Sequence, residues 1–402
     1  MKKIFTGELA TIIIMMSTAS LAMAILQPIM PLYLTSIAIV PSLIGLMLAT
    51  GMVGMVFGES SGGWLADKVG LKFPLIIGTF ICAPLVLSFV FVRSASNIFL
   101  IFLFWGVVRA AIFGPARGYI GNAASLSNKA TLIAVYMTSQ SVARSLGSLA
   151  SGYIADNLGY NWDFYVSVAV SILAGVLVLI GLRKTPMWKS ARDRPLSESD
   201  PISSKIQVPF ARPPVNYRPF VIQCMVTALF LLAVGVNTFL PLLATQVVGV
   251  DATQVGLIYT AGSLVNTVML IPMGRLADRR DKKQLMILGM LLSAAALAGL
   301  GFTTSYPLLI VLVILTNLSF AVFTPAAVAL LSNTVPAYWQ GTAMGIYGAA
   351  EDIGIIIGSG AGGFLWSAGG PVALYSIGSA AAVIGAIICL GFVREKPNRQ
   401  GV

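Results

Sequence analysis

Long apolar segments separated by short polar ones make up almost the whole chain. Twelve of them hold about 20 residues or more, enough for a helix to cross the roughly 30 Å hydrocarbon core of a bilayer. The segments are continuously apolar, whereas the strands of a membrane barrel alternate apolar and polar residues over about ten positions. The pattern therefore predicts an all-α membrane protein with twelve transmembrane helices. The predicted spans cover residues 8–34, 42–66, 73–92, 97–117, 130–154, 162–182, 219–246, 252–276, 284–303, 306–331, 341–366 and 371–393.

One long polar segment interrupts this pattern between the sixth and the seventh span. Residues 183–218 are rich in proline and in charge, which is typical of a linker. The segment predicts an N-terminal six-helix bundle over residues 1–182, a cytoplasmic linker, and a C-terminal six-helix bundle with a short cytoplasmic tail over residues 219–402.

Composition supports a chain embedded in lipid. Hydrophobic residues make up 57% of the sequence and charged residues 10%, against roughly 25% charged residues in soluble domains. The first apolar segment is too long for the core of a cleavable signal peptide, so we expect it to be the first span.

The positions of the 25 Lys and Arg residues predict the orientation, because positive residues near span ends are retained in the cytoplasm. Three depart from the pattern: Arg93 falls on the outer side, and Arg109 and Arg144 lie within spans. The remaining 22 fall on the side of the termini. We therefore expect a multi-pass protein of the inner, cytoplasmic membrane with both termini in the cytoplasm. The net charge of +11 then reflects topology and attraction to anionic lipids rather than nucleic-acid binding.

A ten-residue stretch occurs twice in the chain. Residues 63–72, with the sequence GWLADKVGLK, return 211 positions later as residues 274–283, GRLADRRDKK. Further matches at offsets of 210 or 211 include Tyr136 with Tyr347, Gly45 with Gly256 and Pro31 with Pro241. Six spans copied in the same orientation predict a pseudo-two-fold axis along the membrane normal, with a binding site between the halves.

Both copies resemble the signature loop G-x-L-A-D-[RK]-x-G-[RK]-[RK] of the major facilitator superfamily, and the resemblance extends over essentially the whole chain. The first copy departs from the motif at Leu71, in place of a basic residue, and the second at Asp281, in place of a glycine. The resemblance implies a transporter fold of two pseudo-symmetric six-helix bundles.

The resemblance also implies that these loops latch the halves together when the cytoplasmic side is closed. Asp67 would reach the start of the eleventh span near residues 340–342, and Asp278 the start of the fifth near residues 129–131; a helix N-terminus stabilises a carboxylate. The expected latch residues are Gly63, Asp67, Lys68, Gly70, Lys72, Gly274, Asp278 and Arg279. Alternatively, the loops only anchor the topology through their basic charge.

An ionisable residue at membrane depth costs on the order of 3 kcal/mol unless it is paired or hydrated. Glu351 and Asp352 lie about ten residues into the eleventh span, and adjacent helical residues point about 100° apart, so we expect one to face the cavity and the other a helix interface. With no histidine in the chain, a desolvated carboxylate is the only conventional proton carrier. We predict Glu351 or Asp352 as the proton-coupling site. Glu59 is a further candidate, with pairing to a basic residue near the cytoplasmic face as its alternative.

Two arginines lie within spans of the N-terminal half. Arg109 to Gly114 fits the pattern R-x-x-x-x-G that drug:proton antiporters of the superfamily carry in their fourth span. By that resemblance Arg109 would bias the proton affinity of a nearby carboxylate or contact an anionic part of the substrate; the alternative is a structural arginine bonded to backbone carbonyls. Near Arg144 the fifth span lacks the proline of the antiporter element G-P-x-x-G-G.

Polar residues at matched depth in the two halves predict a cavity wall. Gln27 and Asn237 each precede a proline by four positions, and proline bends a helix and frees a carbonyl, which suits helices that rock. The expected cavity residues are Arg109, Arg144, Gln27, Asn237, Tyr33, Tyr136, Tyr347 and Asn317, with Trp105 and Asn266 as further candidates.

The residue inventory argues against several other classes of protein. Without histidine there is no His-based metal site or catalytic triad, the nucleotide-binding pattern G-x-x-x-x-G-K-[ST] is absent, and the three cysteines lie inside apolar segments. We therefore expect no enzyme activity, no metal, no cofactor and no ATP-driven pumping.

The predicted function is a secondary active transporter that moves a small molecule by alternating access. The family resemblance favours proton-coupled efflux of amphipathic or drug-like compounds. The alternatives are an uptake symporter or facilitator for an anionic metabolite, favoured by the two intramembrane arginines, a lipid flippase, and a sensor that binds substrate without transport. The expected partners are the small-molecule substrate, protons and membrane lipids, and the chain is expected to be a monomer.

Overall fold

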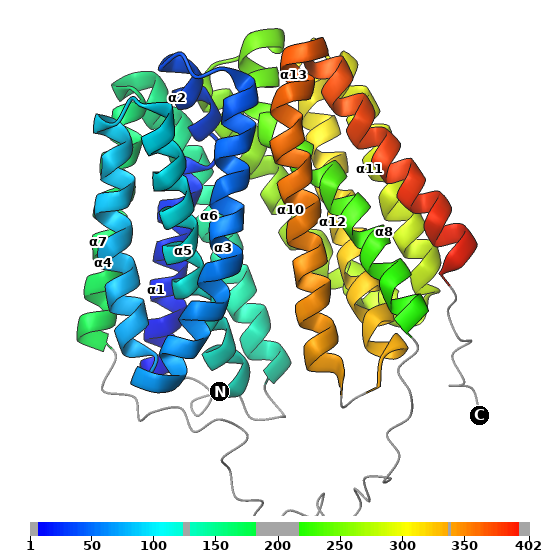
Figure 1. Ribbon diagram of the computed structural model, residues 1–402, viewed down its shortest axis with the longest axis horizontal. Coiled ribbons are helices and arrows are strands. Elements are labelled where there is room, and N and C mark those ends of the chain that lie inside the picture. The colour runs from blue at the N-terminus through cyan, green and yellow to red at the C-terminus, as the bar shows by residue number, and fades with distance from the viewer. Residues whose placement is uncertain (1–6, 124–128, 182–216, 337–338, 394–402) are drawn as a thin grey trace, which may run out of the picture.

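The computed structural model describes residues 7–123, 129–181, 217–336 and 339–393, which are almost entirely helical. Within this part of the chain, ten helical segments are long and apolar enough to span a membrane. Two more crossings complete the predicted twelve. The more polar helix α6 (Lys129–Leu158) is 30 residues long, and α13 (Gln340–Phe392) covers two spans because its backbone leaves the helical conformation at Gly369 and Gly370 and reverses direction (Figure 1).

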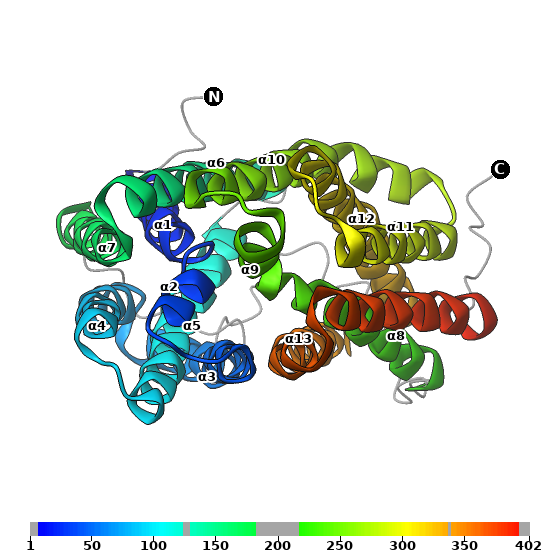
Figure 2. The same cartoon turned by 90° about the horizontal axis from the view of Figure 1, so that it is seen from above.

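The helices form two bundles that lie side by side (Figures 1 and 2). The N-terminal half contains α1 (Gly7–Leu26), α2 (Met30–Ser36), α3 (Pro41–Val69), α4 (Lys72–Phe91), α5 (Ala95–Ala123), α6 and α7 (Tyr160–Gly181). The C-terminal half contains α8 (Tyr217–Gly235), α9 (Leu240–Leu242), α10 (Ala252–Arg279), α11 (Lys282–Phe302), α12 (Tyr306–Thr334) and α13. Residues 182–216, which include most of the predicted linker, lie outside the described residues.

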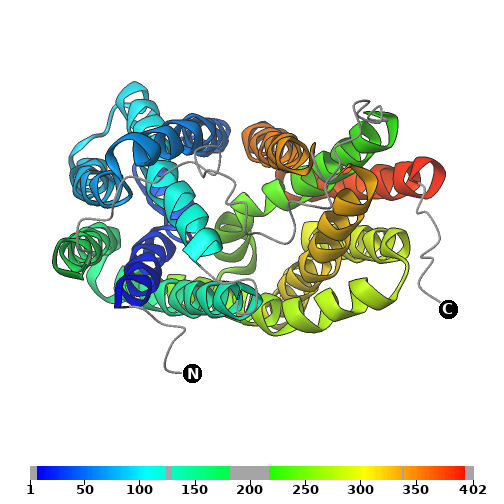
Figure 3. The same cartoon turned by 90° about the horizontal axis from the view of Figure 1, so that it is seen from below.

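The molecule has two opposite faces, at the two ends of its helices. α1 begins and α13 ends at the lower side of Figure 1, which we call the terminal face and which Figure 3 shows from below. The opposite side, where α2 ends and α10 begins, is called the far face.

The first and the seventh predicted spans are both interrupted near the far face. α1 ends at Leu26, and α2 begins at Met30 with Pro31 in its first turn. In the C-terminal half, α8 is followed by a 3-10 segment, by α9 with Pro241, and by a π-helical segment, Leu243–Val248. Helix breaks thus occur at the two matched prolines, as expected for a residue that removes a backbone hydrogen bond.

Buried apolar side chains form three clusters, whose positions show how the halves are joined. Near the terminal face, one cluster with Tyr136 is formed by the N-terminal half alone, and another with Tyr347 by the C-terminal half alone. The third cluster lies toward the far face and contains residues of both halves, among them Leu34 and Leu240. Close packing therefore joins the halves at the far face, and their helices diverge toward the terminal face (Figure 1).

Two helix crossings between the halves repeat each other by the internal duplication. α3 packs against α13, and α6 against α10 (Figure 2). A Cβ atom on Gly45 of α3 would lie 2.5 Å from the carbonyl oxygen of Ser359, and one on Gly256 of α10 would come even closer to that of Ser148. Only glycine allows the backbones to approach this closely.

Replacing Gly256 with leucine is expected to separate α6 from α10 at the far face. Overpacking of this kind costs about 1–3 kcal/mol, which corresponds to roughly a 5- to 150-fold loss of this conformation. A Ser263→Cys variant reports the change, because Ser263 lies in the crossing and should react faster with a membrane-impermeant maleimide once the helices part. Gly391→Leu is the control, since a Cβ atom there meets nothing within 4 Å. Equal labelling in the two backgrounds would contradict the expectation.

Candidate functional site

A helix cap at the far face provides a polar link between the halves. Asp156, in the last turn of α6, accepts hydrogen bonds from the backbone N–H groups of Ala252 at 3.1 Å and Thr253 at 2.6 Å, and from the Thr253 hydroxyl at 2.5 Å. Asp251, in the same half as α10, accepts from the N–H of Gln254 at 2.7 Å. The first turn of a helix leaves its N–H groups without intrahelical partners. Carboxylates from both halves therefore cap α10.

Hydroxyl groups continue the contact between α6 and α10. The Thr260 hydroxyl donates to the carbonyl oxygen of Ser145 at 3.0 Å, and the Ser145 and Ser263 hydroxyls share a hydrogen bond. Arg144 directly precedes Ser145; its side chain is exposed, and its guanidinium donates to the Ser141 hydroxyl at 3.2 Å. The structure thus places Arg144 beside the boundary between the halves.

Among the side chains that the structure describes, no carboxylate caps α3 at the equivalent crossing of α3 and α13. Ser367 occupies the position that matches Asp156 in the duplicated half, and its hydroxyl donates to the Gly363 carbonyl of its own helix at 3.0 Å. The N-cap residue of α3, Val40, makes no side-chain cap. The charged cap is therefore a feature of the α6–α10 crossing, whereas the glycine contact is common to both.

Glu351 and Asp352 are both partly buried in α13 and lie on different sides of it. Glu351 follows Tyr347 by one turn, on the side that packs against α8, where the Thr227 hydroxyl donates to the Tyr347 hydroxyl at 3.2 Å. Asp352 precedes Ser359 by about two turns, so it shares the side of α13 that faces α3. Of the two carboxylates, Asp352 is on the side nearer the boundary between the halves.

Arg109 lies on α5, inside the N-terminal half. Its guanidinium carbon is 5.7 Å from the ring centroid of Trp105, within the range of a cation–π interaction. Trp105 in turn packs against Phe89 and Phe102, with ring centroids 6.1 and 6.0 Å away. The structure thus places Arg109 against an aromatic cluster of the N-terminal half.

Two of the residues predicted to line the cavity lie where a helix is interrupted, and a third lies at a contact between two helices. Gln27 is exposed at the break between α1 and α2. Asn237 is partly buried in the 3-10 segment that follows α8, and its Oδ1 is buried without a hydrogen-bond partner among the described residues. Asn317 donates to the Val313 carbonyl of its own helix at 2.9 Å and packs against Gly262 of α10. The first two occupy matched positions in the two halves.

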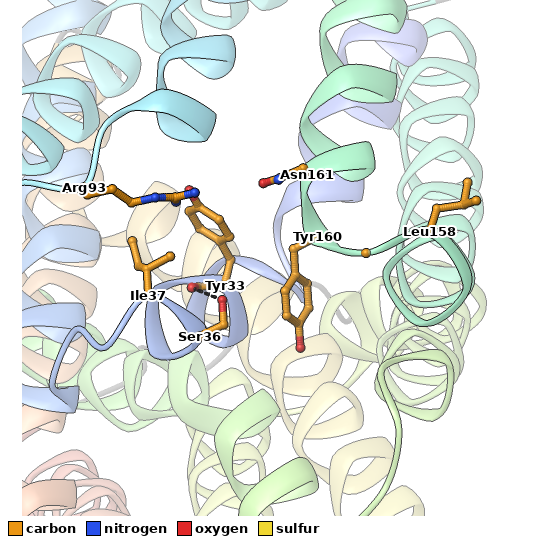
Figure 4. A pocket seen from close by; sticks show the side chains of 8 residues that line it. Tyr33, Ser36, Ile37, Arg93, Leu158, Tyr160 and Asn161 are labelled. Atoms are coloured by element: carbon orange, nitrogen blue, oxygen red, sulfur yellow. Dashed lines mark hydrogen bonds between the residues drawn. The ribbon is translucent and has the colours of Figure 1, made fainter.

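Tyr33 lies in the N-terminal half at the far face. Its hydroxyl donates to the Phe89 carbonyl at 2.5 Å and accepts from Arg93 at 2.5 Å. Tyr33 and Arg93 line a pocket of about 220 Å³, on whose opposite side Tyr160 and Asn161 lie (Figure 4). The pocket is completed by Ser36, Ile37, Leu158 and Gly159. The predicted cavity tyrosines are thus dispersed, since Tyr136 and Tyr347 are buried near the terminal face.

The two signature loops make matched contacts at the terminal face. The Lys72 ammonium donates to the Leu179 carbonyl at 3.2 Å, and the Lys283 ammonium to the Leu390 carbonyl at 2.7 Å. The donors and the acceptors are both related by the offset of 211. Each bond connects the signature loop to the last turn of the final helix of the same half, where a cation satisfies free carbonyls. These lysine ties therefore act within each half.

The remaining latch residues are placed only in part. Lys68 lies over the Trp64 ring at 4.1 Å, and Gly70 ends α3 with φ of +83°. Asp278 and Arg279 are exposed, and a Cβ atom on Gly274 would meet nothing within 4 Å. The side chains of Glu59, Gly63, Asp67 and residues 129–134 lie outside those described. The predicted bonds of Asp67 and Asp278 across the boundary therefore stay predictions.

Two acidic residues at the far face were not singled out from the sequence. Asp156 follows the predicted end of the fifth span, and its partners are 96 and 97 positions away in the other half. Asp163, in the first turn of α7, is 0% exposed, and neither of its carboxylate oxygens has a hydrogen-bond partner among the described residues. The Asp251 and Gln254 capping pattern marks the start of α10, but no sequence signal marks a second carboxylate from the other half.

Comparison with known sequences gives matches over nearly the whole chain. The sequence profile of the Major Facilitator Superfamily matches residues 12–248 and 224–402. An uncharacterized MFS-type transporter of Methanocaldococcus jannaschii is 21% identical over 371 residues, covering 92% of this chain and 94% of the relative. Multidrug resistance protein 2 of Bacillus subtilis is 24% identical over 91% of each chain. The cis,cis-muconate transport protein of Acinetobacter baylyi is 22% identical over 88% of this chain and 85% of its own.

Solved structures agree on the fold. The nucleoside transporter NupG superposes with a TM-score of 0.76 at 14% sequence identity, covering 97% of this chain and 100% of that one. A bacterial homologue of the human lysosomal transporter spinster gives a TM-score of 0.72 at 12% identity, covering 95% and 94%. The chain therefore belongs to the major facilitator superfamily and is a secondary transporter, not an enzyme.

Proposed function

We propose that this transporter exports amphipathic or drug-like compounds in exchange for protons. The observation that carries the alternating-access part of this proposal is the joining of the two halves at one face. The shared apolar cluster and the Asp156 cap lie at the far face, whereas the clusters near the terminal face are separate. With the termini in the cytoplasm, as the Lys and Arg distribution predicts, this conformation opens toward the cytoplasm.

In the proposed cycle the two bundles rock about the boundary between them. Opening of the far face breaks the Asp156 cap and parts the glycine crossings, while the terminal-face ends of the bundles approach each other. The interrupted helices α1–α2 and α8–α9 lie at the far face and provide segments whose backbone can adjust. Substrate enters between the bundles from the cytoplasm or the inner leaflet and leaves through the far face.

The choice of efflux rests on similarity and is open to a direct test. A relative named as a multidrug resistance protein favours export of drug-like compounds. The relative named as a cis,cis-muconate transport protein favours an anionic metabolite as the substrate, as does the presence of Arg109 and Arg144 in the N-terminal half, and uptake of such a metabolite is the alternative. Purified protein in liposomes with an imposed proton gradient separates the two, because substrate moves against the proton flow in antiport and with it in symport.

We further propose that Glu351 or Asp352 carries the coupling proton. The isosteric variants Glu351→Gln and Asp352→Asn, measured in the same liposomes, test this assignment. The variant at the coupling position is expected to lose about 5- to 150-fold of its gradient-driven flux, the range of a coupling free energy of about 1–3 kcal/mol. Asp281→Asn is the matched control, since Asp281 is exposed and caps α11 at 3.1 Å from the Gln284 N–H. Full gradient-driven flux in both test variants would refute the assignment.

Arg109→Ala is expected to abolish transport without lowering the amount of protein in the membrane. Removal of the guanidinium eliminates the positive charge that we propose biases proton or substrate binding, and the Trp105 ring it contacts is held by other aromatic residues. Flux per transporter, normalised to membrane abundance, is the measurement. Arg275→Ala, at an exposed position of α10, serves as the control. Normal flux in Arg109→Ala would leave only a structural role for this residue.

Asp156→Asn is expected to weaken closure of the far face, because an amide oxygen caps α10 without a negative charge. A carboxylate near an exposed helix N-terminus contributes about 0.3–1 kcal/mol, so the ratio of closed to open molecules should fall about twofold to fivefold. Spin-label distances across the far face measure that ratio. Asp251→Asn is the control because Asp251 caps α10 from within its own half. An equal effect of the two substitutions would show that the cap does not link the halves.

A further inference from the structure

Asp163 is a buried carboxylate without an evident structural purpose. It lies in the first turn of α7, is 0% exposed, and has no hydrogen-bond partner at either oxygen among the described residues. Buried polar side chains are rarely left unpartnered, and an ionised carboxylate in such a place is strongly unfavourable. Burial without a partner therefore favours the neutral form of this carboxyl group.

The duplicated half shows that the fold does not require an acid at this position. Gly159, which begins the turn into α7, matches Gly370 at the offset of 211, and both have positive φ, +88° and +62°. At the same offset Asp163 matches Leu374, which is also 0% exposed. An apolar side chain therefore fills the equivalent site, and an acid at Asp163 calls for a functional explanation.

The neighbouring acid, Asp156, connects this site to the boundary between the halves. Only the tight turn at Gly159 separates Asp156 from Asp163, and the Tyr160 phenol is close enough to interact electrostatically with both carboxylates. Asp156 accepts three hydrogen bonds from α10, at the positive end of that helix. A second negative charge in a buried position beside it is disfavoured, which favours the neutral form of Asp163 while the cap is made.

We propose that Asp163 is a proton-binding site through which closure of the far face takes up one proton from the medium on that side. On closing, a proton from water forms the O–H bond of Asp163 as the turn between α6 and α7 is buried. On opening, α6 leaves α10 and water reaches the turn; the O–H bond breaks, the proton passes to water on the same side, and a hydrated carboxylate remains. The proposal rests on the proposed alternating access, because opening of the far face is one of its steps.

Few other ionisable groups lie on the helices that surround Asp163. α7 packs against α1, α4 and α6, and the described side chains of α1 include no ionisable group. α4 contributes Cys82, with Lys72 at its terminal-face end, and α6 contributes Tyr153 and Asp156. The remaining neighbours at this end of the bundle are Tyr33, Arg93, Tyr160 and Tyr165 of the N-terminal half and Asp251 of α10. Asp163 is the buried carboxylate of this group, whereas Asp156 and Asp251 are exposed.

Spin-label distances across the far face, recorded as a function of pH, test the proposal without substrate or gradient. Labels are attached at Asn157→Cys on α6 and Val247→Cys before α10, in a background with the three native cysteines replaced by alanine. The ratio of closed to open molecules should rise about tenfold for each unit by which the pH falls, over the pH range in which Asp163 is ionised in the open state and protonated in the closed state. The change should be reversible.

Three substitutions give distinct results if the proposal holds. Asp163→Asn and Asp163→Leu cannot ionise, so both should remain closed at every pH and lose the pH dependence; the leucine reproduces the matched residue of the other half. Asp156→Asn should lower the closed fraction at every pH but keep the tenfold dependence. Retention of the dependence in both Asp163 variants, or its absence in the parent protein, overturns the proposal.

The outcome is separable from that of the proposed function. Loss of the pH dependence in the Asp163 variants, together with an absence of proton-driven flux in liposomes, would support the gate proposal and refute proton-coupled transport. Proton-driven flux together with an unchanged pH dependence in the Asp163 variants would support proton-coupled transport and refute the gate proposal.

Discussion

Close packing at the far face is the interaction on which the rest of the structure depends. Helices in lipid gain little from the hydrophobic effect, because the surrounding chains are as apolar as their own side chains; they associate through van der Waals contact. Gly45 and Gly256 permit that contact by bringing the backbones of opposite halves together, and Leu34 and Leu240 fill the space between the interrupted helices. Near the terminal face no cluster of the described residues spans both halves, so the two bundles are free to differ in separation there.

The polar contacts at this boundary respond to changes that leave the apolar packing unaffected. Apolar contacts respond little to protons or ions, whereas the Asp156 cap consists of one charge at a helix N-terminus and can be weakened by hydration or by a change of charge. The cap occurs at only one of the two matched crossings. The internal duplication therefore supplies a symmetric scaffold, and the difference between Asp156 and Ser367 makes one side of it responsive. Asp163 lies next to the responsive side.

The sequence predicts the architecture well because its two strongest signals, the apolar segments and the internal duplication, extend over the whole chain. The length of the apolar segments identifies the spans, and the duplicated loops show how the two halves correspond. Together they predict a span at the more polar α6, where the structure has a helix. The separation of Glu351 from Asp352 also follows from helical periodicity. The far-face site could not be predicted in the same way, since the partners of Asp156 lie in the other half of the chain and no local pattern specifies which helix ends meet. The burial of Asp163 likewise depends on tertiary packing beyond its own helix.

The matched lysine ties at the terminal face have a consequence for how the cavity walls behave. Lys72 and Lys283 each connect an early helix of their bundle to its last one, so each bond opposes splaying of its own bundle at the wide end. A rocking motion would then alter the gap between two walls of constant shape. Discrimination among ligands would depend on how far apart those walls stand, and a bulky molecule would be accommodated by a wider angle between the bundles, not by deforming either one.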